Sequence, residues 1–357
     1  MKKIVFIGGV GKKNDFGGEL TKNKTILDFL QRKGYRIDLV DTYNSRKKPW
    51  KLIKLPFYLV ANRKEDIIIS TTLDNIVWLL KILIFTGSKR NIIYWGIGGN
   101  FPNKIKQGII DKKILSIIKI IIVEGNAMKE TLAECGITNV LVCPNFKKIN
   151  YLPDISVARK DDVISKQLRN KKYKKFVFLS RIQPEKGVDI IINVARKLND
   201  NGYENNYIID FYGSIAPNYQ DEFLSKINII GNLEYKGRID LTKNMGYDVL
   251  STYDMMLFPT YWRGEGFPGV VIDAYISGLP IVATDWHLNK EFIVDGETGF
   301  IISSLCIDKS LYEIMERILN GEMDEKIMLM SDECQKRAAS FDVDFAIENK
   351  NILTYLS

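Results

Sequence analysis

The sequence predicts an α/β protein that is built from two domains, each with a doubly wound parallel sheet. Short apolar runs alternate with helix-like segments along both halves of the chain. The 357 residues exceed what one hydrophobic core usually supports. With 46% hydrophobic and 26% charged residues, the composition is that of a globular protein.

The first half predicts six strands, placed where apolar and β-branched residues cluster in short runs. These strands are expected at Ile4–Ile7, Arg36–Val40, Asp66–Ser70, Asn91–Trp95, Lys119–Val123 and Val140–Cys143. Between them, helices are expected at Leu20–Arg32, Asn75–Phe85 and Ala127–Glu134. This alternation is typical of a Rossmann-like domain.

The second half repeats the alternation, so a second Rossmann-like domain is expected. Its strands are predicted at Phe176–Leu179, Tyr207–Tyr212, Leu233–Tyr235, Met255–Phe258, Ile281–Ala283 and Phe300–Ile302. Its clearest helices are Val188–Leu198 and Pro268–Ser277. Between the halves, Ser156–Lys175 is rich in Lys, Arg, Asp and Asn and indicates a linker. We expect the domain boundary near residue 155.

Cysteine usage and the amino terminus indicate a cytoplasmic protein. The four cysteines have neither the CxxC spacing of a zinc site nor the density of a disulfide scaffold. The basic start is followed by an apolar run that is too short for a signal peptide and ends in glycines, which predicts a first strand. The apolar run Ile76–Phe85 is too short to span a bilayer and contains Lys81. A net charge of +8 favours anionic partners without choosing among them.

Two glycine-rich loops fail the common phosphate-binding patterns. Gly8–Asn14 lacks the third glycine of a dinucleotide fingerprint and the spacing of a Walker loop, and Gly96–Phe101 ends on Phe instead of Gly. A nicotinamide-dependent dehydrogenase is therefore disfavoured. Gly17 and Gly18 precede an expected helix, where their amides are suited to a phosphate or a sugar hydroxyl. An ordinary strand-to-helix turn explains them equally well.

Two cations follow the first strand of the second domain. Arg181 and Lys186 lie in the loop between the strand Phe176–Leu179 and the helix Val188–Leu198. Ligands of open α/β sheets bind beyond the carboxyl ends of the strands, so both side chains are expected beside the ligand crevice. A guanidinium fork and an ammonium suit a diphosphate leaving group. Two ordinary surface cations are the alternative.

A carboxylate on an apolar helix makes the ligand-binding interpretation stronger. Pro268 suits the first turn of a helix and Gly278 its end. Asp273 is the one charged residue in this expected helix and is flanked by apolar residues, which predicts burial. A buried carboxylate needs hydrogen-bond partners. The two hydroxyls of a ribose are suitable partners, and so are a backbone amide or a neighbouring Tyr.

The loop before this helix adds a second carboxylate, Glu265, which is expected to face the crevice beside Gly266. The amides of Phe267, Gly269 and Val270 are expected to be free at the helix start, where they form a positive pole suited to anionic oxygens.

These segments together resemble the donor-binding half of the GT-B glycosyltransferases, in particular the retaining family four (glycosyl transferases group 1). The stretch EGFPGVVID, Glu265–Asp273, has the spacing of that family's Glu-x7-Glu signature, with Asp where the family usually has a second Glu. Ser180–Gly187 resembles its Gly-Arg-…-Lys-Gly element, Tyr235–Ile239 the stretch near the nucleotide base, and Val294–Phe300 the turn after the donor site. The resemblance is strong from 176 to 302 and mainly architectural over 1–150.

The resemblance implies a fold of two Rossmann-like domains that face each other across a cleft. It implies an acceptor-side domain over 1–155, a donor-binding domain over 156–342, and a C-terminal helix, about 343–357, that crosses back to the first domain.

The resemblance also implies residue roles. Arg181 and Lys186 would bind the donor diphosphate, Asp273 the ribose, and Glu265 would orient the transferred sugar. The shorter Asp273 withdraws its carboxylate by about 1.5 Å, one C–C bond, relative to Glu. Further donor-binding residues are expected at Gly17, Gly18, Arg238, Gly266, Phe267, Pro268, Gly269 and Val270.

Such enzymes are expected to retain the anomeric configuration, with the departing phosphate oxygen accepting the acceptor's proton. No separate base, cofactor or metal is then expected. His287, the single histidine, is interpreted as part of a strand-end loop. The DxD of Asp342–Asp344 is interpreted as a helix start with Asp342 as N-cap, not as a metal site.

Fewer sequence features indicate which acceptor is bound. Lys47–Tyr58 interleaves cations with aromatic and aliphatic residues, a composition suited to an anionic membrane surface or, equally, to a basic loop that completes the core. A membrane contact would fit a lipid-linked saccharide acceptor in bacterial surface-glycan synthesis. The alternatives are a GT-B epimerase or phosphorylase and a basic non-enzymatic membrane- or nucleic-acid-binding protein. No nucleic-acid partner is expected.

Overall fold

The computed structural model describes residues 2–12, 15, 17–45, 55–61, 64–85, 90–156 and 173–356. The chain divides into two compact units. The first contains Met1–Lys148, Gly264–Gly269 and Phe341–Ser357, and the second contains Ile149–Arg263 and Val270–Ser340. This division differs from the expected one in two ways: the chain leaves the first unit at Lys148 instead of near residue 155, and Gly264–Gly269 groups with the first unit.

The first unit is built on a six-stranded parallel sheet with the order β2-β1-β3-β4-β5-β6. All six strands expected in this half of the chain are confirmed. They are β1 (Lys3–Gly8), β2 (Arg36–Asp41), β3 (Asp66–Thr71), β4 (Ile92–Gly96), β5 (Ile120–Val123) and β6 (Val140–Val142). The strand order reverses after β1, so β1 and its neighbours form the switch point at which such sheets bind ligands.

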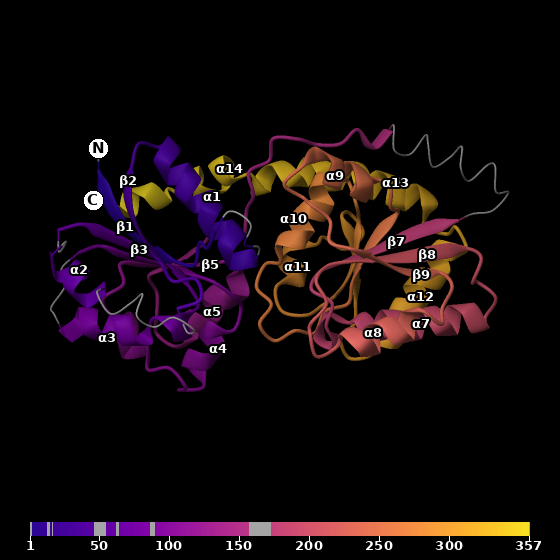
Figure 1. Ribbon diagram of the computed structural model, residues 1–357, viewed down its shortest axis with the longest axis horizontal. Helices are drawn as coiled ribbons and strands as arrows, with labels where there is room; N and C mark the ends of the chain where they lie inside the picture. Colours follow the sequence, from indigo (N-terminus) through magenta and orange to yellow (C-terminus); the bar gives the residue numbers. More distant parts are fainter. Residues whose placement is uncertain are drawn as a thin grey trace. The chain divides into compact units, whose positions relative to one another are not determined.

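Helices cover both faces of this sheet (Figure 1). The helices are α1 (Gly18–Arg32), α2 (Leu55–Ala61), α3 (Val77–Phe85), α4 (Phe101–Lys106), α5 (Asn126–Glu134) and α14 (Val343–Glu348). Ile26, Phe29 and Leu30 of α1 pack with the buried strand residues Phe6 and Trp95 in one core cluster. The α1 helix is amphipathic because these apolar residues recur at helical spacing.

The second unit repeats the plan with the strand order β12-β11-β10-β7-β8-β9. The six strands expected here are also confirmed. They are β7 (Lys174–Leu179), β8 (Tyr207–Tyr212), β9 (Leu233–Gly237), β10 (Met255–Phe258), β11 (Ile281–Thr284) and β12 (Gly299–Ile302). All the pairings are parallel. The inner strands β7, β10 and β11 are buried on both faces, which is why they form nearly continuous apolar runs in the sequence.

The helices of the second unit also form two layers (Figure 1). They are α7 (Val188–Asp200), α8 (Gln220–Ile227), α9 (Asn244–Ser251), α10 (Gly269–Ile276), α11 (Asn289–Phe292), α12 (Ile307–Leu319) and α13 (Asp324–Ala338). Residues of α7, α8 and α12 share one core cluster with Phe176 and Phe178 of β7. The α10 helix is buried at six successive positions beginning at Val271, as its apolar sequence predicts.

The C-terminal segment belongs to the first unit and differs from the single helix expected over 343–357. It forms α14 and then a 3-10 turn at Ile352–Tyr355. The two are separated at Asn351, whose φ of 50° is left-handed and cannot continue a helix. Asp342 is confirmed as the N-cap of α14, since its carboxylate accepts a hydrogen bond from the Asp344 amide at 3.0 Å.

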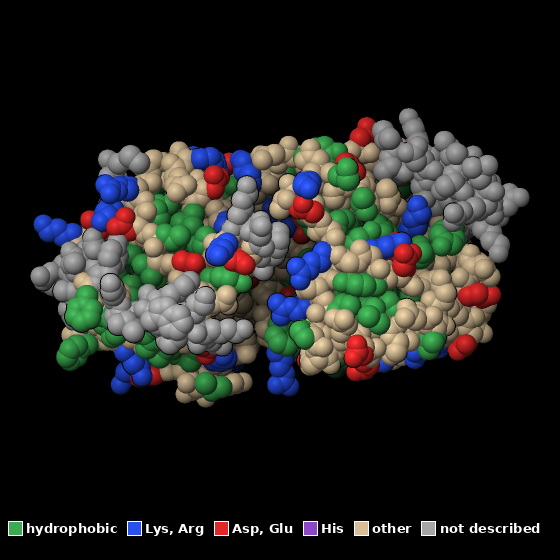
Figure 2. Space-filling model, viewed as in Figure 1, with side chains coloured by type: hydrophobic (Ala, Val, Ile, Leu, Met, Phe, Trp, Pro, Cys, Tyr) green, Lys and Arg blue, Asp and Glu red, His purple; other side chains and the backbone are tan. Residues whose placement is uncertain are grey.

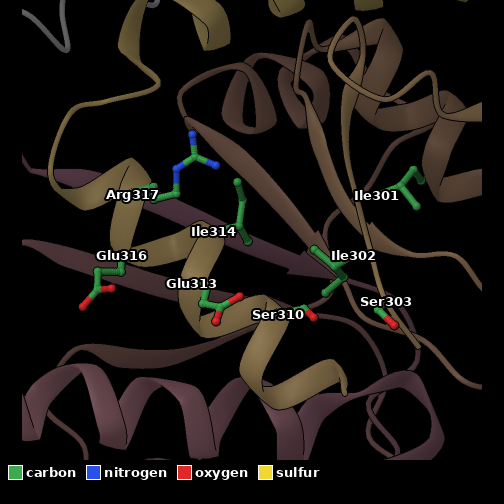
Figure 3. A pocket seen from close by; sticks show the side chains of 8 residues that line it. All are labelled: Ile301, Ile302, Ser303, Ser310, Glu313, Ile314, Glu316 and Arg317. Carbon is green, nitrogen blue, oxygen red and sulfur yellow. The ribbon is translucent and has the colours of Figure 1, made fainter. Parts of the chain in front are cut away.

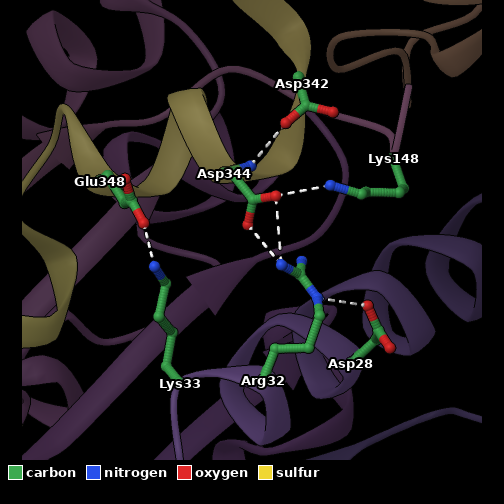
Figure 4. Close-up of polar contacts among 7 residues, drawn as sticks. All are labelled: Asp28, Arg32, Lys33, Lys148, Asp342, Asp344 and Glu348. Atoms are coloured by element: carbon green, nitrogen blue, oxygen red, sulfur yellow. Dashed lines mark hydrogen bonds and ion pairs between the residues drawn. The ribbon is translucent and has the colours of Figure 1, made fainter. Parts of the chain in front are cut away.

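Ion pairs hold α14 against α1 (Figure 4). The Asp344 carboxylate contacts Arg32 at 2.8 Å and Lys148 at 2.6 Å. Lys33, the C-cap residue of α1, pairs with Glu348 of α14. The exposed members of this network contribute little each, but Val343, Ala346 and Ile347 bury their side chains in the same core cluster as α1. The apolar face of α14 therefore supplies most of the attachment.

Candidate active site

The loop that carries Arg181 follows β7 at the carboxyl edge of the second unit's sheet. Its backbone is fixed by the neighbouring loop after β8: the Ile182 amide donates to Ser214 O and the Ala216 amide donates to Ile182 O, both at 2.9 Å. Gly213 allows this contact, because a Cβ atom there would lie 1.8 Å from Ser180 O. The Arg181 side chain itself is exposed. A rigid loop thus presents a guanidinium where sheets of this kind bind ligands.

Lys186 lies further along the same loop, in a 3-10 turn that spans Pro184–Lys186. Its Nζ atom lies 5.8 Å from the ring centroid of Phe258, the last residue of β10. Gly187 follows with a φ of 80°, and a Cβ atom there would lie 2.3 Å from Pro259 O. The glycine lets the loop pack closely against the end of β10. Both expected phosphate-binding cations therefore lie on one rigid loop.

Asp273 is buried on α10, as the apolar helix predicts, with 3% of its surface exposed. One of its carboxylate oxygens accepts a hydrogen bond from the Tyr247 hydroxyl of α9 at 3.1 Å. Burial, together with the nearby Asp273 charge, raises the pKa of Tyr247 above its usual value. Tyr247 therefore stays a neutral donor, and a tyrosine is a partner of Asp273. Arg238 is exposed directly after β9.

Glu265 and its neighbours pack in the first unit, at the carboxyl edges of β4 and β5. The Gly99 amide donates to Gly264 O at 3.4 Å. A Cβ atom at Gly99 would lie 1.9 Å from Glu265 O and 3.2 Å from the Gly266 Cα atom. The glycines after β4 thus serve close backbone packing against the Glu265 segment, not dinucleotide binding.

The expectation that the Phe267 amide is free to bind an anion is wrong. This amide donates to Glu124 Oε2 at 2.8 Å. The helix α10 begins only at Gly269, so Phe267 belongs to the preceding loop. The Phe267 carbonyl accepts from Asn145 Nδ2 at 3.0 Å, and its ring packs edge-on against Phe341 with centroids 5.0 Å apart. Phe267 therefore anchors the loop. Pro268, Gly269 and Val270 follow it as half-buried residues.

Gly17 and Gly18 lie exposed at the start of α1. The residue that sequence reasoning missed is the next one, Glu19. Its carboxylate accepts from the Gly9 amide at 3.3 Å, and burial raises its pKa above the usual value. A carboxylate at the switch point of the first sheet is placed to contact a ligand. Its position directly after two glycines and at a helix start was the available signal.

A pocket of about 450 Å³ opens elsewhere in the second unit, between the edge strand β12 and helix α12 (Figure 3). Its lining consists of Ile301, Ile302, Ser303, Ser310, Glu313, Ile314, Glu316 and Arg317. None of the expected site residues lines it. In Figure 3 the side chains of Glu316 and Arg317 lie away from Ser303.

Two further observations concern the described residues. No three His, Cys, Asp or Glu side chains gather within reach of one metal ion in the described ranges. His287 has a φ of 48° and packs its ring against Trp286, in the loop after β11, which agrees with the interpretation as a loop residue. Among the described helices, none combines the length and the apolar character that crossing a bilayer requires.

Comparisons with solved structures support the fold. The chain resembles HepE of Anabaena in complex with UDP, with a TM-score of 0.72 and 18% identity over 100% of both chains. It also resembles sucrose-phosphate synthase of Thermosynechococcus elongatus, with a TM-score of 0.74, 13% identity and coverage of 99% of this chain and 98% of that one. Together with the two parallel six-stranded sheets, these likenesses establish a two-domain α/β fold of the GT-B type.

Several relatives of known sequence are named as glycosyltransferases. An uncharacterized glycosyltransferase of Methanocaldococcus jannaschii is 25% identical over 75% of this chain and 66% of its own length. The capsular polysaccharide biosynthesis glycosyltransferase CapM of Staphylococcus aureus is 27% identical over 41% of this chain and 36% of its own length. The chain thus spans less than two thirds of the length of these relatives.

The profile of one protein family matches the second half of the chain. This family is described as glycosyl transferases group 1, and the match covers residues 159–338, half of the chain. The matched range contains the loop of Arg181 and Lys186, the Glu265 segment and helix α10. The chain therefore belongs to the glycosyl transferases group 1 family.

Proposed function

We propose that this protein is a retaining glycosyltransferase of family four. It transfers a sugar from a UDP- or GDP-linked donor to a saccharide or lipid-linked saccharide acceptor in bacterial surface-glycan synthesis. The observation that carries the proposal is the second unit's arrangement of an exposed Arg181 and a half-buried Lys186 on one rigid loop at the carboxyl edge of the sheet. The names of relatives agree, since CapM serves capsular polysaccharide biosynthesis and HepE binds UDP.

Each residue has a separate task in this proposal. Arg181 and Lys186 bind the donor diphosphate, and their charges stabilise the negative charge that grows as the nucleotide leaves. The buried Asp273 accepts from a ribose hydroxyl while Tyr247 holds its other side. Arg238 contributes beside the nucleotide base, and Glu265 orients the transferred sugar. A departing phosphate oxygen takes the acceptor's proton on the same face, so the anomeric configuration is retained without a protein base.

Thermal unfolding with a panel of UDP-, GDP- and ADP-linked sugars tests the donor class. A ligand that binds only the folded protein stabilises it by about 2.7 kcal/mol at a concentration of 100 Kd, so the true donor should raise Tm by several degrees. We expect UDP- or GDP-linked sugars to do so. The anomeric proton of the product, read by NMR, should show the same configuration as the donor.

Three outcomes would contradict the proposal. Sugar-nucleotide turnover that needs no acceptor would favour an epimerase. Salt-dependent affinity for DNA, without a thermal shift from any sugar nucleotide, would favour a nucleic-acid-binding protein. An inverted product would leave the transferase activity in place and overturn retention.

We also propose that the first unit lies against an anionic membrane at the cytoplasmic side. Residues 47–54, the core of the expected membrane segment, lie outside the described residues. Helix α3 supports the proposal independently: Trp78, Lys81 and Phe85 are exposed at helical spacing, opposite the buried Leu79 and Leu83. Figure 2 shows hydrophobic side chains gathered on the surface near α2 and α3. Aromatic residues beside cations are typical of interfacial helices.

Liposome co-sedimentation tests this contact. The protein should sediment with vesicles that contain anionic lipid, and Phe85→Ser should lower the bound fraction at least threefold, since about 0.8 kcal/mol is lost per CH2 withdrawn from the acyl region. Leu305→Ser is the matched control, because Phe85 is 92% exposed and Leu305 is 96% exposed. Equal binding to anionic and neutral vesicles would refute the proposal.

A further inference from the structure

The first unit contains a buried ion pair that the proposed chemistry has not used. Lys22 lies on α1 and Glu124 lies directly after β5, and the Lys22 Nζ to Glu124 Oε1 distance is 2.6 Å. The two side chains are only 3% and 7% exposed. Removing two charges from water costs more free energy than a well-packed apolar pair would. Stability alone is therefore a weak reason for this pair.

The aromatic neighbours of Lys22 fix its position. Its Nζ atom lies 5.9 Å from the ring centroid of Trp95 and 5.8 Å from that of Phe146. Both rings are nearly fully buried and pack edge to face, with centroids 5.6 Å apart. Such rings attract a desolvated ammonium and leave it little freedom. Lys22 thereby holds one oxygen of Glu124 in one place.

The other oxygen of Glu124 contacts the segment that carries Glu265. Oε2 accepts the Phe267 amide at 2.8 Å. A Cβ atom at Gly266 would lie 2.1 Å from that same oxygen, so the carboxylate also lies against the Gly266 backbone. The Gly99 backbone also packs closely against this segment, because a Cβ atom at Gly99 would lie 1.9 Å from Glu265 O. Glu265 is thus attached to a backbone that both Glu124 and Gly99 contact.

We propose that Lys22 and Glu124 are positioning residues that set the backbone of Glu265 for catalysis. The inference rests on the proposed role of Glu265 in orienting the transferred sugar. The carboxylate holds the Phe267 amide through a charge-assisted hydrogen bond, which is shorter and stronger than a neutral one. Lys22 neutralises and aims that carboxylate, because an unpaired charge could not stay buried. A displacement of about 1 Å at a reacting group can cost about 100-fold in rate.

Two double variants without the buried charges test whether the hydrogen bond to the Phe267 amide, rather than the buried ion pair itself, is needed for catalysis. Lys22→Met with Glu124→Gln keeps an amide oxygen that can accept from Phe267, whereas Lys22→Met with Glu124→Leu removes the acceptor. Both variants avoid a lone buried charge and have similar side-chain volumes. The Gln variant should keep kcat within about threefold of the wild type, and the Leu variant should lose about 100-fold in kcat.

Binding measurements show whether the loss is local. The UDP affinity of both variants should equal that of the wild type, because the diphosphate ligands Arg181 and Lys186 lie in the second unit. The ratio of the Kd for UDP to the Kd for the UDP-sugar reports the contact to the sugar. This ratio should fall only in the Leu variant. If the panel selects a GDP donor, GDP and its sugar replace the uridine pair.

Asp66→Asn is the control for general destabilisation of this unit. Asp66 is a buried carboxylate, 4% exposed, at the opposite end of the same sheet, where it accepts from Asn91 at 2.9 Å. The Asp66→Asn variant should have a lower Tm than the wild type, with the same kcat and the same ratio of the Kd for UDP to the Kd for the UDP-sugar. Gly266→Ala is a second test, since its Cβ would overlap Glu124 Oε2, and it should reproduce the kcat loss of the Leu variant.

The outcomes distinguish the two hypotheses. Equal kcat and equal affinity ratios in the Gln and Leu variants, with a folded protein and an active wild type, would overturn the positioning role. A wild type that binds no sugar nucleotide would overturn the proposed function instead. If the Leu variant unfolds, Gly266→Ala decides the question, and unchanged kcat in that variant would refute the proposal.

Discussion

Replacing Arg181 or Lys186 by Ala is expected to remove about half or more of the thermal shift produced by the nucleotide sugar. Each substitution would remove hydrogen bonds to the charged diphosphate, and such bonds contribute about 1.5–3 kcal/mol each. The Kd for UDP or GDP should therefore rise about 10- to 100-fold per substitution, as measured by isothermal titration calorimetry. The protein should still fold, because Arg181 is exposed and Lys186 is only half-buried.

Lys309→Ala provides the matched control for this expectation. Lys309 is also a cation of the second unit, its side chain is 73% exposed, and its pair with Glu313 is 3.8 Å long. It should change neither the thermal shift nor the Kd. A full thermal shift in Arg181→Ala or Lys186→Ala would refute the proposed diphosphate contact. The conservative change Arg181→Lys should recover part of the affinity, since a point charge remains while the planar fork is lost.

Glu265→Gln is expected to lower kcat by about 100-fold or more while the UDP affinity stays unchanged. The substitution keeps the shape of the side chain and removes its charge. Loss of a single polar contact to a transition state typically lowers kcat by roughly 10²–10³-fold. Glu265 is 7% exposed, so the isosteric change should perturb packing little. Steady-state kinetics with separate Kd measurements would separate the two effects.

Glu313→Gln is the control, because Glu313 is an exposed carboxylate on α12 outside the proposed site. It should leave kcat and KM unchanged. A Glu265→Gln variant with normal kcat and a raised KM would show that Glu265 contributes only uniform binding, and a fully active variant would exclude it from the reaction.

The strands were predictable because each depends on local sequence. A parallel strand that is covered on both faces must be apolar throughout, so Met255–Phe258 or Ile120–Val123 is recognisable from a few residues. Burial of Asp273 was predictable for the same reason, since one carboxylate interrupts an otherwise apolar helix. The hydrogen bond from Tyr247 was not, because it joins two different helices.

The contacts around Glu265 could not be predicted from the sequence near it. Lys22 and Glu124 are separated by 102 residues, and Glu124 and Phe267 by 143. Nothing in the stretch around any one of them indicates a buried charge. The glycines after β4 were visible, but their purpose is the close approach of a backbone that is distant in sequence. Likewise, the left-handed Asn351 separates α14 from the final 3-10 turn, so that one continuous helix over 343–357 does not form.

The chain crosses between its two units several times, so a cut at any single position divides the first unit. The first unit takes its final core residues, among them Val343 and Ile347, from the far end of the sequence. A fragment cut at Lys148 would lack them, together with the Phe267 and Phe341 rings. The stretch from Glu265 to Asp273 is itself divided, with its first carboxylate in one unit and its second in the other. The first unit therefore cannot be produced whole from the first half of the gene, and a domain exchange with a relative would have to carry Gly264–Gly269 and Phe341–Ser357 with the first unit.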